Sequence, residues 1–215
     1  MSSSELNLAN YLIPLDEIFR ATKNFSLERF IGYSRSSTIY KGQLSELWQN
    51  CTAAVKRLDA GSYQGEREFR NEIEIISRLH HENIISFIGY SDEEGEMIIV
   101  YEYALNASLD HHLLDPSKLS GITWTQRLEI CLGAAKGLDY LHSGHNRIIH
   151  RDVKSSMIWL DGNMVAKIYD FGLSVLVEPN QPHAHGHGVA GTGNYIDPLY
   201  EQSVTTGRNL CSNFI

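Results

Sequence analysis

Two aspartates with distinctive neighbours are the residues of this sequence that could most readily do chemistry. Asp152 lies in the stretch "HRDVKSS", and Asp170 opens the tripeptide "DFG". Transfer of a phosphoryl group needs one carboxylate that orients the attacking hydroxyl and another that holds Mg²⁺ against the phosphates. We therefore take Asp152 as the candidate catalytic base and Asp170 as the candidate metal ligand.

A lysine and a glutamate extend this pair. Lys56 ends the stretch "AAVK" on a predicted strand, from which its ammonium can reach phosphate oxygens. Glu72 flanks an apolar stripe at helical spacing, so it can lean out of the core towards Lys56 and hold it in place. Each motif alone is weak evidence, because each occurs by chance. Their joint order and spacing make a strong signal.

The surrounding pattern predicts an α+β chain whose first half is mostly strand. The apolar segments and turn signals predict strands over 30–33, 38–44 and 52–58, and a β-hairpin over 84–103 that turns at residues 93–95. Helical spacing predicts helices over 15–25 and 64–80.

The second half is predicted to be mostly helical. Thr123 and Gln126 form a possible capping box. The apolar stripe of the helix that follows consists of Trp124, Leu128, Cys131, Ala135 and Leu138. Short strands over 157–160 and 165–168 flank "DGN", which is a hairpin signal.

Composition excludes several classes of function. A formal charge of −8 argues against a surface that binds nucleic acid or anionic membrane. No apolar stretch reaches the length of a membrane-spanning helix, and residues 1–13 lack the pattern of a signal peptide. Three widely separated cysteines suit a reducing compartment better than a disulfide framework. These features predict a cytoplasmic domain, attached to the inner face of the plasma membrane only through a partner.

The chain resembles the kinase domain of plant receptor-like Ser/Thr protein kinases of the Pelle-related class. The resemblance is carried by "IYKG", "EFRNEIEIISRLHHENI", "IVYEYALNASLDHHL", "GLDYLHSG", "IIHRDVKSS", "KIYDFGLS" and "GTGNYIDPLY", from about residue 15 to about residue 206. It implies a bilobal kinase-like fold. The implied divisions are an N-terminal segment with a short helix (1–24), an antiparallel β N-lobe with one long helix (25–104), a partial, mostly α C-lobe with catalytic and activation loops (105–206), and an atypical tail (207–215).

The resemblance also implies roles for individual residues. Lys56 and Glu72 form an ion pair between a strand and a helix, Asp152 is the base, Lys154 touches the γ-phosphate of ATP, and Asp170 binds Mg²⁺. The implied ATP-binding residues, with Tyr101 as gatekeeper and Glu102 and Ala104 as the hinge, are Ile31, Gly32, Ile39, Ala54, Lys56, Tyr101, Glu102, Ala104 and Trp159. In the activation loop, Arg151 would pair with a phosphate, and Thr192 would either face the substrate or be phosphorylated. The implied partners are a protein substrate or another kinase or receptor.

Several residues depart from the family pattern. Met157 stands where the family has an Asn that binds magnesium, and a thioether is a poor ligand for a hard cation. Ser34 and Ser37 replace two glycines of the phosphate loop. Trp159 replaces a Leu beneath adenine, where an indole either stacks on the base or fills the pocket. The magnesium site is therefore predicted to be impaired, and catalysis weak.

The end of the sequence is a further departure. After "DPLY" the family continues into a buried helix, whereas here "GRNLCSNFI" leads to Ile215, which predicts an incomplete C-lobe. Three interpretations remain open: a weak Ser/Thr kinase, a pseudokinase that binds a partner, and a shortened product without a stable C-lobe. His183, His185 and His187 resemble a metal-binding tract, but a solvated activation loop explains them better.

Overall fold

The computed structural model describes residues 8–34, 36–61, 63–115, 121–143, 147–177, 183–184, 188–203 and 206–207. The chain divides into two compact units. The first, here the N-terminal unit, contains the described residues up to His80 together with Ser86–Tyr103. The second, here the C-terminal unit, contains His81–Ile85 and the described residues from Ala104 onwards. Of the predicted tail over 207–215, residues 208–215 lie outside the described residues.

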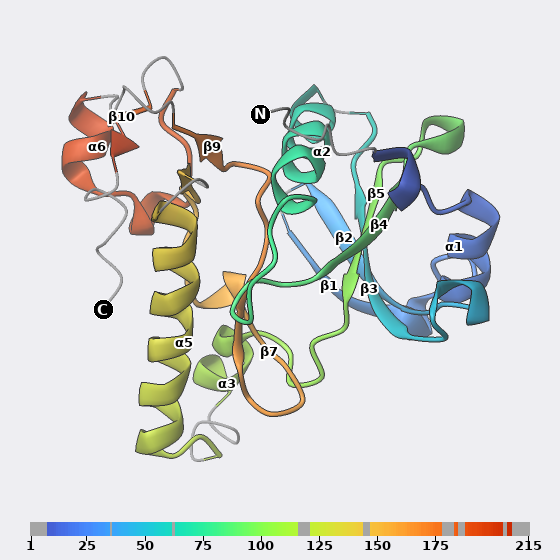
Figure 1. Cartoon of the computed structure of the whole chain (residues 1–215), viewed down its shortest axis with the longest axis horizontal. Coiled ribbons are helices and arrows are strands. Elements are labelled where there is room, and N and C mark those ends of the chain that lie inside the picture. The colour runs from blue at the N-terminus through green and yellow to red at the C-terminus, as the bar shows by residue number, and fades with distance from the viewer. Residues whose placement is uncertain are drawn as a thin grey trace, which may run out of the picture. The chain divides into compact units, whose positions relative to one another are not determined.

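A five-stranded antiparallel sheet forms the N-terminal unit (Figure 1). Its strands follow the order β1-β2-β3-β5-β4. They are β1 (Phe30–Tyr33), β2 (Ser37–Gln43), β3 (Thr52–Leu58), β4 (Phe87–Ser91) and β5 (Ile98–Glu102). The last two form a hairpin that turns through a short 3-10 helix at Glu93–Gly95, as the sequence predicts.

Two helices cover opposite faces of this sheet, and the alternation of side chains along β3 shows which residues meet each helix. Ala53 and Val55 belong to the core cluster that includes Ile18 of α1 (Leu15–Thr22). Lys56 points the other way, because its ammonium contacts α2 (Tyr63–Ile76). The apolar face of the sheet therefore holds the unit together, while the opposite face presents the polar side chains of the candidate site.

Helix α1 is shorter than the predicted 15–25. Lys23 adopts a left-handed conformation (φ 52°) and its N–H bonds to helix carbonyls, which ends the helix at Thr22. Asn24 and Phe25 continue with positive φ, so the predicted last turn is not helical. Helix α2 likewise ends at Ile76 rather than at residue 80.

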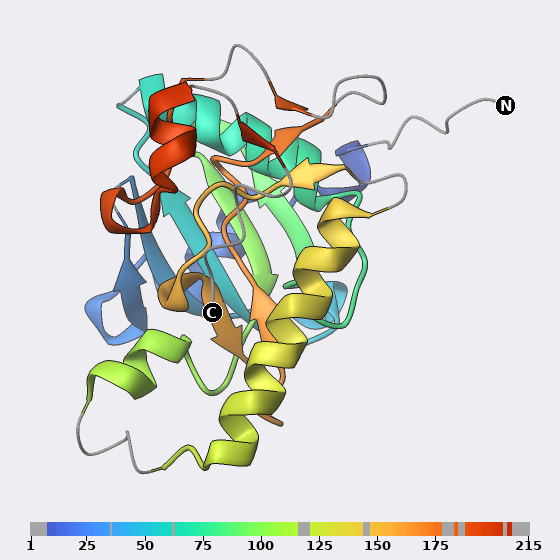
Figure 2. The same cartoon turned by 90° about the vertical axis from the view of Figure 1, so that its left-hand side faces the viewer.

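The C-terminal unit is built on α5 (Trp124–His142) and a set of short strand pairs (Figure 2). The predicted capping box is confirmed: the Thr123 hydroxyl accepts from the Gln126 amide, and the Gln126 side chain accepts from the Thr123 amide. The pairs are β6 (Ile148–Ile149) with β9 (Val175–Leu176), β7 (Ile158–Leu160) with β8 (Ala166–Ile168), and β10 (His183–Ala184) with β11 (Thr206–Gly207). The other α-helices among the described residues are α3 (Leu109–Leu114) and α6 (Pro198–Ser203).

The buried face of α5 is not the predicted stripe. Trp124 is 74% exposed and Leu128 is 53% exposed, and Cys131 and Ala135 are exposed as well. The buried residues are Ile130, Gly133, Ala134, Gly137 and Leu141. A Cβ at Gly137 would lie 2.7 Å from the carbonyl oxygen of Asn83. The helix therefore packs through its small residues, because only glycine permits this close approach of backbones.

Removing the side chain that joins α1 to the sheet is expected to destabilise the N-terminal unit. Ile18→Ala should lower the free energy of unfolding by about 2–5 kcal/mol, because Ile18 is fully buried in the cluster between α1 and the sheet. Urea denaturation measures this loss. Leu27→Ala is the control, since Leu27 is 91% exposed and its truncation should change stability by less than about 0.5 kcal/mol. Equal effects of the two variants would contradict the packing of α1 against the sheet.

Candidate active site

A buried ion pair joins the strand and the helix of the N-terminal unit. Lys56 Nζ lies 2.7 Å from Glu72 Oε2, and the two side chains are 2% and 0% exposed. The hydroxyl of Tyr101 donates a hydrogen bond to the other carboxylate oxygen, Glu72 Oε1. Burying two charges is costly unless their remaining polar atoms also find partners. Both oxygens of Glu72 are thus engaged, and the lysine ammonium is held at a defined place on the sheet.

The register of the sheet brings these residues together. Ala54 pairs with Tyr101, and Lys56 pairs with Ile99 on the neighbouring strand β5. Lys56 and Tyr101 therefore share one face of the sheet at a diagonal spacing, within reach of long side chains. The resemblance assigned Tyr101 only a gatekeeper place. Its bond to Glu72 was missed, because Tyr101 lies on another strand and only the register of β3 with β5 places it on the same face as Lys56.

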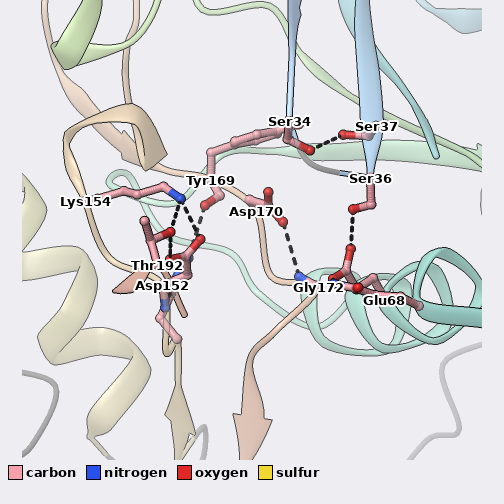
Figure 3. Close-up of polar contacts among 12 residues, drawn as sticks. Ser34, Ser36, Ser37, Glu68, Asp152, Lys154, Tyr169, Asp170, Gly172 and Thr192 are labelled. Carbon is pink, nitrogen blue, oxygen red and sulfur yellow. Dashed lines mark hydrogen bonds and ion pairs between the residues drawn. The ribbon is translucent and has the colours of Figure 1, made fainter. Parts of the chain in front are cut away.

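The phosphate loop between β1 and β2 is held by its serines. The Ser34 and Ser37 hydroxyls are 2.7 Å apart, and the Ser34 amide donates to the Ser37 carbonyl (Figure 3). Ser36, also in this loop, donates to Glu68 of α2. None of these three serines has a positive φ, so replacing glycine by serine imposes no strained backbone at these positions. A Cβ at Gly32 would meet no atom within 4 Å.

The other predicted nucleotide-binding residues lie on the sheet or beside it. Ile31 is on β1 and partly exposed, whereas Ile39 on β2 and Ala54 on β3 are buried. Glu102 ends β5, where its carboxylate accepts from the Ser86 amide. Ala104 and Trp159 belong to the C-terminal unit. Trp159 is buried on β7, with its ring 4.9 Å from that of Tyr169.

Three polar side chains of the C-terminal unit form a closed triangle (Figure 3). Lys154 Nζ donates to Asp152 Oδ2 at 2.9 Å and to the Thr192 hydroxyl at 2.6 Å. The Thr192 hydroxyl in turn donates to Asp152 Oδ1 at 2.7 Å. The carboxylate of Asp152 thus accepts from both an ammonium and a hydroxyl group. The sequence left the place of Thr192 open, because nothing local links residue 192 to residue 152.

The backbone that carries Asp152 is fixed by the two residues before it. His150 is fully buried; its Nδ1 accepts from the Asp152 amide, and its Nε2 lies 3.1 Å from the Tyr169 carbonyl. These partners place the ring proton on Nε2. Burial lowers the pKa of His150 below its usual 6.5, although the nearby charges of Asp170 and Asp152 oppose the shift.

Arg151 binds backbone carbonyls. Its guanidinium donates to the carbonyls of Leu173 and Gly188, at 2.6 and 3.3 Å. These bonds tie the catalytic-loop segment to the segment that leads to Thr192. The predicted pairing of Arg151 with a phosphate remains a prediction.

Asp170 and Met157 are the two residues on which the predicted impairment of the metal site depends. Asp170 has a left-handed backbone (φ 69°), and its Oδ1 accepts from the Gly172 amide at 3.4 Å. Met157 is buried and contributes a backbone carbonyl to the Tyr169 amide. Among the described residues, no group of three His, Cys, Asp or Glu side chains could hold a metal ion. Asp170 suits one contact to Mg²⁺, but the thioether of Met157 does not suit a second. His185 and His187 lie outside the described residues.

The site combines two ion pairs. Lys56 on β3 pairs with Glu72 on α2, and Asp152 of the "HRD" motif pairs with Lys154. Both pairs are typical of protein kinase domains. The family model "Protein tyrosine and serine/threonine kinase" matches residues 25–192, and the chain belongs to this family of protein kinase domains.

Curated relatives narrow the class to receptor-like kinases. The chain is 47% identical over 194 residues to "Receptor-like protein kinase HERK 1" of Arabidopsis thaliana, which covers 89% of this chain and 23% of that protein. It is 47% identical over 186 residues to "Receptor-like protein kinase THESEUS 1" of the same plant, covering 86% and 21%. The chain thus spans less than a quarter of the length of these relatives. In the described part of the chain, no helix combines the length and apolarity needed to cross a membrane.

Removing the Tyr101 hydroxyl is expected to weaken the buried ion pair. Tyr101→Phe should lower the free energy of unfolding by about 1.5–3 kcal/mol, because a buried carboxylate loses a donor. Denaturation of the variant measures this. Tyr33→Phe is the control, because Tyr33 is exposed on β1. An unchanged stability of Tyr101→Phe would show that this hydrogen bond contributes nothing to the unit.

The buried His150 is expected to remain neutral at mildly acidic pH. Its pKa is lower in the folded state than in the unfolded state, so the unfolded state binds the proton first. The contribution of His150 to stability is therefore full above about pH 6.5 and declines as the pH falls below that value. Ring chemical shifts in NMR, assigned with His150→Gln, should report a titration midpoint below 6.5. A titration midpoint at or above 6.5 would contradict the burial of this ring.

Proposed function

We propose that the chain binds ATP and transfers its γ-phosphoryl group slowly to serine or threonine hydroxyls of proteins. The observation that supports this most directly is the bond from the Thr192 hydroxyl to Asp152 Oδ1. A catalytic base must lie within hydrogen-bonding distance of the hydroxyl that it deprotonates. The Asp152 carboxylate already accepts an aliphatic hydroxyl at 2.7 Å, so its oxygen is suited to a substrate hydroxyl of the same kind.

In the proposed reaction, Asp152 orients the substrate hydroxyl and accepts its proton. The hydroxyl oxygen forms a bond to the γ-phosphorus while the bond from that phosphorus to the β,γ-bridging oxygen breaks, and ADP leaves. Lys154, which lies 2.9 Å from Asp152, would move its ammonium onto the transferred phosphoryl group and neutralise its charge.

Residues of both units are the proposed nucleotide-binding groups. Lys56, held by Glu72, would contact the α- and β-phosphates. The other proposed nucleotide-binding residues are Gly32 of the phosphate loop, the apolar residues Ile31, Ile39 and Ala54, the backbone at Tyr101, Glu102 and Ala104, and Trp159. Asp170 would hold Mg²⁺, which when bound stabilises negative charge on the phosphates.

Met157 accounts for the low rate in this proposal. It replaces an oxygen ligand of magnesium by a buried thioether. A metal ion contributes several kcal/mol of transition-state stabilisation, and about 1.4 kcal/mol corresponds to a factor of ten in rate. Partial loss of this contribution would lower the rate on the order of a hundredfold.

The second candidate function is that of a binding module without catalysis. The same buried Met157 favours it, together with Trp159 packed against Tyr169. In this alternative the chain binds another kinase or a receptor, and that partner would also place it at the inner face of the plasma membrane.

Restoring the metal ligand is expected to separate the two functions. Met157→Asn should raise phosphoryl transfer to a generic protein substrate by about tenfold or more, because an amide oxygen ligates Mg²⁺ where the thioether does not. Incorporation of labelled phosphate measures the change. No gain, with nucleotide still bound, would contradict magnesium ligation as the limiting factor.

Two controls accompany this experiment. Asp152→Asn should abolish the activity of both the parent chain and Met157→Asn, and activity that survives would come from another source. Thermal unfolding with and without Mg·ATP tests nucleotide binding independently of catalysis, because a ligand of the native state raises the midpoint. A cooperative transition that nucleotide does not shift would favour the binding module.

A further inference from the structure

The tip of the phosphate loop is fastened at two points that the sequence motifs do not reveal. The Ser36 hydroxyl donates to Glu68 Oε2 at 2.5 Å (Figure 3). The Ser36 carbonyl accepts from the Asp59 amide at 2.8 Å. Glu68 is also held from its other side, because Gln64 Nε2 donates to Glu68 Oε1 at 2.8 Å. The carboxylate is therefore oriented before it meets the loop.

Helix α2 is the common anchor of two elements of this unit. Glu68 and Glu72 are four residues apart, so they lie on one side of the helix, one turn from each other. Glu68 holds Ser36 of the phosphate loop, and Glu72 holds Lys56 of β3. The phosphate loop and Lys56, which are far apart in the sequence, are thus bound to the same two turns of α2.

We propose that Ser36 and Glu68 are positioning residues that form a latch, here the Ser36–Glu68 hydrogen bond, which orders the phosphate loop before nucleotide binds. This inference rests on the proposed binding of ATP. A free loop loses conformational entropy when it closes on a ligand, and an ordered loop loses less. The Ser34–Ser37 hydroxyl contact acts in the same direction within the loop.

The latch is partly exposed, so its effect is moderate. A hydrogen bond to a charged acceptor is stronger than a neutral one, but solvent competes for both Ser36 and Glu68 here. Loss of the latch should raise the dissociation constant and the KM for Mg·ATP by about three- to tenfold. It should leave kcat nearly unchanged, because neither residue takes part in the proton or phosphoryl transfer steps.

Amide hydrogen exchange of the nucleotide-free chain tests the latch by itself. Ser36→Ala and Glu68→Ala should accelerate exchange of the Ser34 and Asp59 amides several-fold, since these amides donate to the Ser37 and Ser36 carbonyls. Glu66→Ala is the matched control on α2. Glu66 is exposed, and its ion pair with Arg70 is exposed as well, so losing it should change stability little. Unchanged exchange in Ser36→Ala would overturn the latch, whatever the behaviour of nucleotide.

Nucleotide titrations then test what the latch does. Ser36→Thr keeps the hydroxyl and should retain the affinity for Mg·ATP, whereas Ser36→Asp places a second negative charge beside Glu68 and should weaken binding more than Ser36→Ala. The double variant of Ser36→Ala with Glu68→Ala should be no weaker than either single variant. The positioning role would be overturned if the losses of affinity in the two single variants add in the double variant. It would also be overturned if Ser36→Thr binds Mg·ATP weakly.

Failure of the latch and failure of the proposed function give different results. If the parent chain does not bind Mg·ATP, the proposed function is wrong, and so is the proposed effect of the latch on nucleotide affinity. Amide exchange then still decides whether the latch exists. If the parent chain binds Mg·ATP and Ser36→Ala binds it equally well, the proposed function stands and the positioning role is wrong.

Discussion

The N-terminal unit depends on one buried electrostatic arrangement, in which Lys56 and Glu72 face each other out of contact with solvent. Neither charge is tolerable there alone, so strand β3 and helix α2 must keep a fixed relation within this unit. Tyr101 completes the arrangement by occupying the second oxygen of Glu72. The apolar cluster with α1 on the other face of the sheet supplies the burial that holds the strands in register.

A different principle organises the C-terminal unit, where backbone groups fix the reactive side chains. His150 accepts from the amide of Asp152, and Arg151 donates to carbonyls on two other segments. Glycines on α5 let the helix approach the segment at Asn83 closely. The carboxylate of Asp152 is thereby held where Lys154 and Thr192 both reach it. These hydrogen bonds act beside an apolar core that includes Ile130, Ile158 and Leu160.

The departures from the kinase pattern affect the two units unequally. Ser34 and Ser37, which stand where the family has glycines in the phosphate loop, contact each other through their hydroxyls in the N-terminal unit. The substitution therefore brings a contact that glycine could not make. Met157 brings no comparable compensation, because sulfur cannot serve magnesium as an amide oxygen does. The chain thus combines a buried lysine–glutamate pair with a thioether where the family has a metal ligand, which is why nucleotide binding and catalysis have to be measured separately.

The sequence by itself determined the features that depend on near neighbours. Short motifs and periodicity predict the strands of the five-stranded sheet, the hairpin at residues 93–95, the capping box of Thr123 and Gln126 and the membership of the kinase family. Only the tertiary structure decided which face of α5 is buried, since helical spacing fits two faces of this helix. The close approach of backbones at Gly137 selects the face that carries the small residues. The tertiary structure also decided the partners of Thr192, Tyr101 and Ser36. These partners are distant in the sequence, and their contacts depend on register and packing that no local pattern encodes.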